Sequence, residues 1–200
     1  MSTRVKLELG PREHGQALSL DEFMSGDYEE GFRYELIEGR LYVTPTPNYP
    51  HDWITEFIQE LLLKYKRKRP DVVSRVSSGA RVFVPGAAGV TAPQPDIALY
   101  RGVPPGPHVD WREISPFLVI EVLGGDDPDK DLVRNVKLYH QVLSIGEYWV
   151  IDIREDPERP TMLVHRRRPR SWQKIEVAFG ETYRTDLLPG FEMLLDPNRG

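Results

Sequence analysis

The chain has 200 residues, of which 40% are hydrophobic, and it contains no cysteine. This length suffices for one domain with its own core, and the lack of cysteine excludes disulfide scaffolds, zinc–thiolate sites and thiol nucleophiles. The formal net charge of −5 argues against a protein that coats nucleic acid through electrostatics alone. Because the N-terminus is polar and no apolar run approaches the roughly 20 residues that span a bilayer, the sequence predicts a soluble cytoplasmic protein without membrane association.

The first half of the chain predicts a short helix, a hairpin and a long helix. Ser19 and Glu22 have the spacing of a capping box, which predicts a helix that begins there. Alternating apolar residues on either side of Glu38 predict a β-hairpin over 34–43. Apolar residues at three- and four-residue steps predict an amphipathic helix over 52–69.

The second half of the chain predicts a sheet with one parallel crossover. Strands are expected over 72–76, 80–84, 96–100, 117–123 and 147–153, with a helix over 128–143. Since that helix separates the last two strands, the order indicates a parallel pair. Three further segments, 161–165, 172–179 and 191–195, read as a closing meander. The predicted class is α/β, with a central mixed sheet in a single domain over 1–200, a core at about 19–153 and a C-terminal β meander at 160–195.

Two carboxylates lie in strand-like apolar segments. Glu121 interrupts the run over 117–123, and Asp96 opens a similar run. An unpaired ionised carboxylate in an apolar sheet costs several kcal/mol, so two of them predict a shared cation or a catalytic cluster. If the helix over 128–143 packs beside Glu121, Lys137 would complete a triangle of two acids and one lysine.

Such a triangle suits phosphodiester hydrolysis. Two hard carboxylates can hold magnesium, which acidifies a bound water, and a lysine can orient that water and stabilise the oxyanion. Taken alone, Asp96 reads as a strand-entry acid and Lys137 as a surface lysine. We also expect Asp96→Asn to raise thermal stability without metal, because it removes one buried negative charge.

Two basic clusters have both a structural and a functional interpretation. The cluster over 64–69 ends the predicted long helix, and the cluster over 165–170 lies at a predicted hairpin turn. Cations at a helix end complement its dipole, so the structural interpretation is favoured for the first. Contact with phosphate remains the alternative for each.

Several segments together resemble the Uma-type family of restriction-endonuclease-like bacterial proteins. They are Tyr34-Glu35-Leu36-Ile37-Glu38-Gly39, Gln94-Pro95-Asp96, Glu121-Val122-Leu123, Lys137-Leu138-Tyr139 and Gly146-Glu147-Tyr148-Trp149-Val150-Ile151-Asp152. The resemblance runs from about 19 to 152 and implies the PD-(D/E)XK nuclease fold, in which helices flank a central mixed sheet. Family members often continue with Ser-Pro after the second acid, whereas this chain has Gly124-Gly125.

The resemblance implies a function and a set of site residues. Asp96 and Glu121 would bind Mg²⁺ or Mn²⁺, and Lys137 would be the functional lysine. Glu35 would be the additional acid, with Glu38 as its alternative. The implied activity is endonucleolytic hydrolysis of DNA, with a homodimer as one option for cutting both strands.

Two questions stay open from the sequence. The rival function is a nuclease-like module that binds nucleic acid or protein without cutting, and the departure at Gly124-Gly125 favours it slightly. His51, at the start of the long helix, is either close to the active site or a surface or capping residue.

Overall fold

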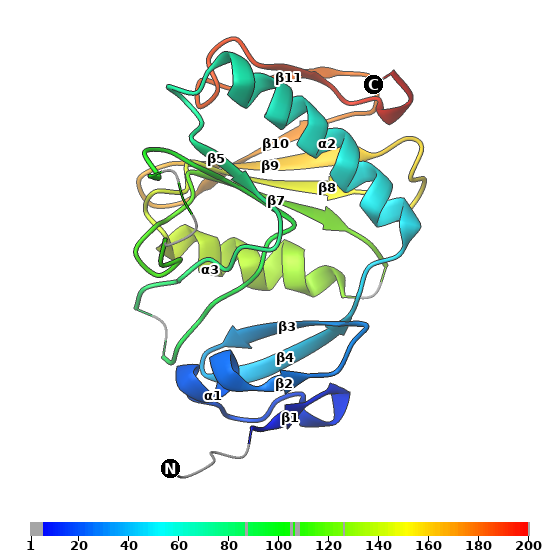
Figure 1. Cartoon of the computed structure of the whole chain (residues 1–200). Coiled ribbons are helices and arrows are strands. Elements are labelled where there is room, and N and C mark those ends of the chain that lie inside the picture. Colours follow the sequence, from blue (N-terminus) through cyan, green and yellow to red (C-terminus); the bar gives the residue numbers. More distant parts are fainter. Residues whose placement is uncertain (1–5, 87, 105, 107–108, 126, 200) are drawn as a thin grey trace.

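A computed structural model describes residues 6–86, 88–104, 106, 109–125 and 127–199, and its centre is a six-stranded sheet (Figure 1). The strand order is β10-β9-β8-β7-β6-β5. The strands are β5 (Arg75–Ser77), β6 (Ile97–Tyr100), β7 (Leu118–Leu123), β8 (Glu147–Asp152), β9 (Thr161–Arg167) and β10 (Trp172–Val177). The pair β7–β8 is parallel and the other neighbours are antiparallel. The predicted mixed sheet and its parallel crossover are confirmed.

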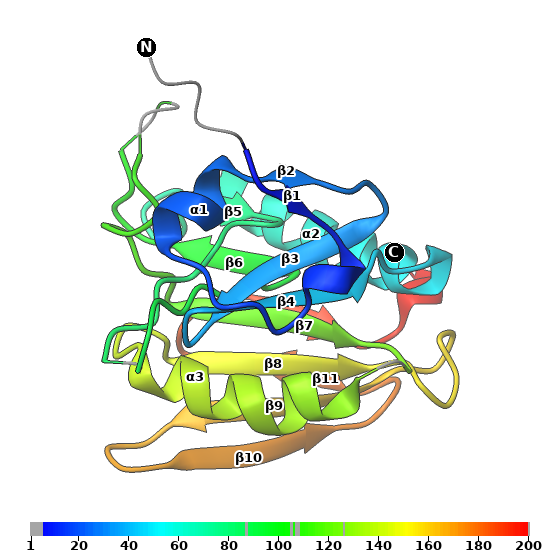
Figure 2. The ribbon, with the colours of Figure 1, turned by 90° about the horizontal axis from the view of Figure 1, so that it is seen from below.

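Different elements cover the two faces of this sheet (Figure 1). One face carries the long helix α2 (Tyr49–Lys68) and the small hairpin β11–β12 (Thr182–Arg184 and Glu192–Leu194). The other face carries α3 (Asn135–Gln141), preceded by the π-helical turn η2 (Lys130–Arg134), and the hairpin β3–β4 (Phe32–Ile37 and Arg40–Pro45), as Figure 2 shows. Strands β6, β7 and β8 are buried along nearly their whole length, because both faces are covered.

The N-terminal elements pack against the outer side of the hairpin β3–β4 (Figure 1). They are β1 (Glu8–Leu9), the 3₁₀ turn η1 (Pro11–Glu13), α1 (Leu20–Ser25) and β2 (Asp27–Tyr28). The capping box predicted at Ser19 is present, since its side chain accepts from the Glu22 N–H. The hairpin turns through Glu38 and Gly39, whose φ angles of 52° and 73° match a turn that favours glycine.

Two predicted strand arrangements are wrong. Residues 80–84 form no strand; the N–H groups of Val82 and Val84 donate instead to the carbonyls of Pro93 and Thr91, at 2.9 and 3.0 Å, and close a loop. The C-terminal strands do not form one meander. Strands β9 and β10 extend the main sheet, whereas β11 and β12 pair with each other, and the chain ends in the 3₁₀ turn η3 (Pro197–Arg199).

The helix predicted over 128–143 differs in detail. Its first turn is π-helical, because the Asn135 N–H bonds to the Lys130 carbonyl five residues back. Its buried side is the stripe Asp131, Asn135, Leu138, Tyr139 and Val142. Leu143, the last residue of the predicted helix, lies outside this stripe, and its side chain is 83% exposed. Among the described residues, no helix is both long and apolar enough to cross a membrane.

Candidate active site

The two strand acids lie opposite each other in adjacent strands. Ile97 of β6 pairs with Ile120 of β7, so Asp96 and Glu121 stand one position further along the same ladder. The Asp96 N–H donates to Glu121 Oε2 at 3.3 Å. Both side chains are buried, and Glu121 is completely so. The sheet therefore brings together the two acids predicted to form a site.

Glu121 is oriented by the buried stripe of α3. Its Oε1 accepts from Asn135 Nδ2 and from the Tyr139 hydroxyl, each at 3.0 Å. Asn135 Nδ2 also lies 3.0 Å from Asp131 Oδ1. Burial raises the pKa of Glu121 well above its ordinary value, and the nearby charges of Asp131 and Asp96 raise it further. Burial and the neighbouring acids therefore outweigh the opposite effect of Lys130 on this carboxylate.

Asp96 is in the opposite electrostatic situation. Its Oδ1 accepts from Arg33 Nη1 at 2.5 Å. Its Oδ2 lies 3.0 Å from His51 Nε2 and accepts from the Val122 N–H at 2.8 Å. Burial alone would raise the pKa of Asp96, but the contacts with His51 and Arg33 hold it well below its usual range. The structure therefore supports the interpretation that places His51 close to the active site.

The cation nearest to Glu121 is Lys130, which the sequence interpretation did not select. Its Nζ lies 3.9 Å from Glu121 Oε2 and 3.7 Å from Asp131 Oδ1, and its side chain is 15% exposed. Burial would lower the pKa of Lys130, but Glu121 and the neighbouring acids hold it above its ordinary value. Burial has the opposite effect on the neighbouring acid and raises the pKa of Asp131 to about 6. The acids around Lys130 thus favour the charged form of its ammonium.

The structure does not bring Lys137 to the two acids. Lys137 lies on the exposed side of α3, away from the stripe that contains Asn135 and Tyr139. Its predicted position rested on a continuous α-helix over 128–143 that packs beside Glu121. The buried stripe in fact begins with two polar residues, Asp131 and Asn135, which a search for apolar periodicity passes over. The spacing of Asp131, Asn135 and Tyr139, each four residues after the last, is the signal that indicates the correct face.

Glu35 lies in the same cluster, on strand β3. Its Oε1 accepts from the Gln94 N–H at 2.8 Å, and its Oε2 accepts from Arg134 Nη2 at 2.5 Å. Burial would raise the pKa of Glu35, but Lys130 and Arg134 hold it below its ordinary value. Glu38 is exposed at the hairpin turn, so the geometry favours Glu35 between the two alternatives.

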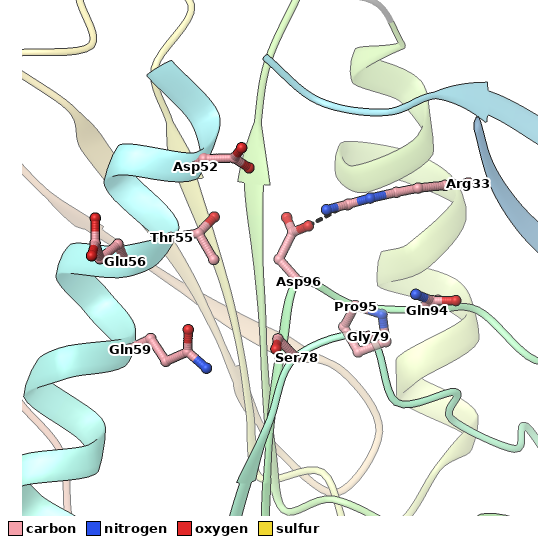
Figure 3. Close-up of a pocket in the computed structure, with 10 residues that line it drawn as sticks. All are labelled: Arg33, Asp52, Thr55, Glu56, Gln59, Ser78, Gly79, Gln94, Pro95 and Asp96. Carbon is pink, nitrogen blue, oxygen red and sulfur yellow. Dashed lines mark hydrogen bonds and ion pairs between the residues drawn. The ribbon is translucent and has the colours of Figure 1, made fainter. Parts of the chain in front are cut away.

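A cleft of about 690 Å³ reaches this cluster. Its walls come from the segment between β4 and α2, the end of β7 and the turn η2. Asp96, His51, Lys130 and Asp131 line it, together with Gly124 and Gly125. Asp96 also lines a second cleft, of about 420 Å³, on the side of α2 (Figure 3). The cluster is therefore accessible to a ligand through Asp96 and Lys130, although Glu121 is fully buried.

The two basic clusters have structural roles at the contacts that the structure shows. In the first, Lys64 of α2 pairs with Glu60, and Arg69, which directly follows α2, pairs with Asp71. In the second, Arg166 bonds to Glu147. Arg167 donates to the carbonyls at the end of α3, among them Tyr139 O at 3.0 Å and Val142 O at 2.9 Å. Arg167 thereby satisfies carbonyl groups that a helix end leaves without partners.

The donor atoms of the cluster fit a hard divalent ion in part. Within the described part of the chain, no group of three or more His, Asp or Glu side chains is arranged to hold a metal by itself. Mg²⁺, however, commonly binds through one or two carboxylates and completes its shell with waters and substrate oxygens. Asp96 and Glu121 supply such a pair, since the Asp96 N–H lies 3.3 Å from Glu121 Oε2 and both carboxylates are buried.

Comparison with known proteins agrees with the architecture. The model of the Uma2 family, described as a putative restriction endonuclease, matches residues 20–197. The fold is similar to a crystal structure of a putative nuclease belonging to DUF820 from Anabaena variabilis, with a TM-score of 0.64 and 18% identity over 89% of this chain and 95% of that chain. At that identity the likeness shows the fold alone. No curated protein matches the chain significantly. The chain belongs to the Uma2 family of putative restriction endonucleases.

Proposed function

We propose that this protein is a Mg²⁺- or Mn²⁺-dependent endonuclease that hydrolyses DNA phosphodiester bonds. The observation that carries the proposal is the cross-strand pair of Asp96 and Glu121, with the ammonium of Lys130 3.9 Å from Glu121. Membership of the Uma2 family supports a nuclease, and the proposal adds the metal, the substrate and the residues.

Asp96 and Glu121 would hold the divalent ion at the edge of the 690 Å³ cleft. When bound, such an ion supplies Lewis-acid stabilisation of the phosphate and an acidified water. Asn135 and Tyr139 fix Oε1 of Glu121, so Oε2 is kept on the side of Asp96 and Lys130. No protein nucleophile is required.

Lys130 takes the place that the sequence interpretation gave to Lys137. We propose that its Nζ donates to the phosphate oxygen on which negative charge accumulates, an interaction that is strong because the side chain is largely buried. Glu35 has a positioning role, since its carboxylate holds Arg134 and adds to the field that keeps Lys130 charged. The π-helical turn that carries Lys130 agrees with this role, because such turns occur frequently at functional sites.

One observation favours the rival function, a module that binds without cutting. Both oxygens of Asp96 already have protein partners, Arg33 on one and His51 with the Val122 N–H on the other. A divalent ion must displace at least one of them to bind. The two functions therefore differ in whether the protein takes up metal at all.

The test is cleavage of supercoiled plasmid by purified protein with Mg²⁺, Mn²⁺ or EDTA, with Asp96→Asn as the matched variant. We expect metal-dependent nicking or linearisation by the wild type and none by the variant. Linear product would report cutting of both strands, as expected of a homodimer with two sites. Intact plasmid with the wild type under both metals, or equal cleavage by the variant, would overturn the proposal.

A further inference from the structure

Arg33 makes the shortest contact with Asp96, one of the two proposed metal ligands. It projects from β3, its side chain is 30% exposed, and its Nη1 lies 2.5 Å from Asp96 Oδ1 (Figure 3). The other oxygen of Asp96 is taken by His51 and the Val122 N–H. In this arrangement no oxygen of Asp96 is left without a protein partner.

Arg33 also lies where the hollows around the site meet. It lines the 690 Å³ cleft that contains Lys130 and the 420 Å³ cleft beside α2. It lines a third, smaller hollow of about 160 Å³, whose wall also contains Arg81. Asp96 is common to the first two clefts, so the Arg33–Asp96 pair forms the partition between them. A guanidinium that leaves Asp96 enters one of these hollows.

We propose that Arg33 is a mobile counter-ion that exchanges Asp96 for a substrate phosphate when a divalent ion binds. The inference rests on the proposed function and deepens it. Without metal, Arg33 neutralises Asp96 and blocks it as a ligand. With metal, Arg33 turns into the cleft and binds a phosphate of the nucleic acid. Metal and substrate binding are thereby coupled through one side chain.

Electrostatics favours the first half of the exchange. A guanidinium and a divalent cation compete for the same oxygen of Asp96, and they repel each other strongly at contact distance because the carboxylate is almost fully buried. The second half follows from the chemistry of arginine. Its planar fork of donors matches phosphate oxygens in a bidentate manner, and half-buried sites strengthen that contact. The exchange also keeps the guanidinium paired in both states.

The test compares Arg33→Gln with a matched control, Arg40→Gln. Arg40 lies at the other end of the same hairpin, is exposed and donates to the Gly15 carbonyl at 3.0 Å, so its removal changes the net charge equally. Mn²⁺ affinity is measured by calorimetry, and thermal unfolding confirms that both variants are folded. Affinity for a short DNA duplex is measured with Ca²⁺ in place of Mg²⁺, with a gel to confirm that the duplex stays intact.

We expect Arg33→Gln to bind Mn²⁺ about tenfold more tightly and DNA about tenfold more weakly than the wild type, and Arg40→Gln to match the wild type in both. Three results would overturn the exchange: unchanged or weaker Mn²⁺ binding by Arg33→Gln, unchanged DNA binding by Arg33→Gln, or an equal shift in both variants. If the wild type still binds Mn²⁺, none of these results contradicts the proposed nuclease. Mn²⁺ binding by Arg33→Gln but not by the wild type would also overturn the exchange, because Arg33 would then exclude the ion rather than give way to it. Absence of Mn²⁺ binding in all three proteins would overturn the exchange and the proposed metal dependence together.

Discussion

The backbone N–H of Asp96 donates to the carboxylate of Glu121 at 3.3 Å, across the antiparallel pairing of β6 and β7. The two acids are thus fixed relative to each other by the sheet itself. Their environments nevertheless shift the two pKa values in opposite directions. His51 and Arg33 lower the pKa of Asp96, whereas burial and the neighbouring acids raise the pKa of Glu121.

This difference reverses the stability effect that the sequence led us to expect at Asp96. Without metal, Asp96→Asn should destabilise the fold by about 3 kcal/mol, since it breaks a buried charge pair and leaves Arg33 without its partner. Glu121→Gln should instead stabilise it by about 1 kcal/mol, because the folded state disfavours the ionised carboxylate. Thermal unfolding at pH 7 in EDTA measures both. Stabilisation by Asp96→Asn would contradict the account of its partners.

The pH dependence at these two acids has opposite signs. Asp96 has a folded-state pKa below its ordinary 3.8, so its contribution is present above pH 3.8 and is lost on acidification. Glu121 has a folded-state pKa above its ordinary 4.5, so its contribution to the free energy of unfolding is largest at low pH and falls as the pH rises. The gain in stability from Glu121→Gln should therefore shrink as the pH is lowered towards 4.5. A gain that is constant from pH 7 to pH 4.5 would exclude Glu121 as its source.

The assignment of the functional lysine is tested by a pair of matched variants. Lys130→Gln should reduce cleavage about a hundredfold or more, because it removes the buried ammonium beside Glu121. Lys137→Gln should leave cleavage within about twofold, since its side chain lies on the exposed side of α3. Single-turnover cleavage at saturating metal measures both. Loss of activity in Lys137→Gln alone would restore the assignment made from the sequence.

Glu147, within the Glu-Tyr-Trp segment that carries part of the family resemblance, has a structural role. Its buried carboxylate accepts from Trp149 Nε1 at 2.8 Å, Arg166 Nε at 2.6 Å, Tyr183 OH at 3.0 Å and Thr185 Oγ1 at 2.9 Å. Glu147→Ala should lower the free energy of unfolding by about 3 to 5 kcal/mol, because it leaves the partly buried Arg166 without its ion-pair partner. Chemical denaturation measures this cost. A loss below about 1 kcal/mol would show that the network contributes little.

His165 should make the protein sensitive to mild acid. Its ring is buried without a hydrogen-bond partner among the described residues and stacks on Tyr148. Burial, and then Lys174, lower its pKa from 6.5 to about 4. The unfolded chain therefore takes up the proton first, and stability is lost as the pH falls from 6.5 towards 4. His165→Phe should retain the stacking and flatten this part of the stability profile, as denaturation midpoints at several pH values will show.

Much of the fold follows from local sequence signals. The Ser19 capping box, the turn at Glu38 and the apolar periodicity of α2 each predict the element that is present, because each signal depends on neighbours along the chain. The pairing of β11 with β12 was missed, because β11 is only three residues long and is too short to show an alternating apolar pattern. The strand expected over 80–84 has backbone bonds to 91–93 that only the folded loop provides.

The candidate site was predictable to a similar degree. Asp96 and Glu121 stand out because acids in apolar strands are costly, and Glu35 was implied by the family resemblance; the structure brings all three into one cluster. Lys130 was not chosen over Lys137, because the buried side of the helix begins with the polar residues Asp131 and Asn135 and its first turn is π-helical. The contact of Arg33 with Asp96 joins segments far apart in the chain and has no local signal.

The most direct test of the central claim is calorimetric titration of Mn²⁺ into the wild type and into the Asp96→Asn, Glu121→Gln double variant. These carboxylates form the cross-strand pair on which the proposed metal site depends. We expect saturable binding at one site in the wild type and none in the variant. Absence of binding in the wild type, or undiminished binding in the variant, would contradict a metal centre at Asp96 and Glu121.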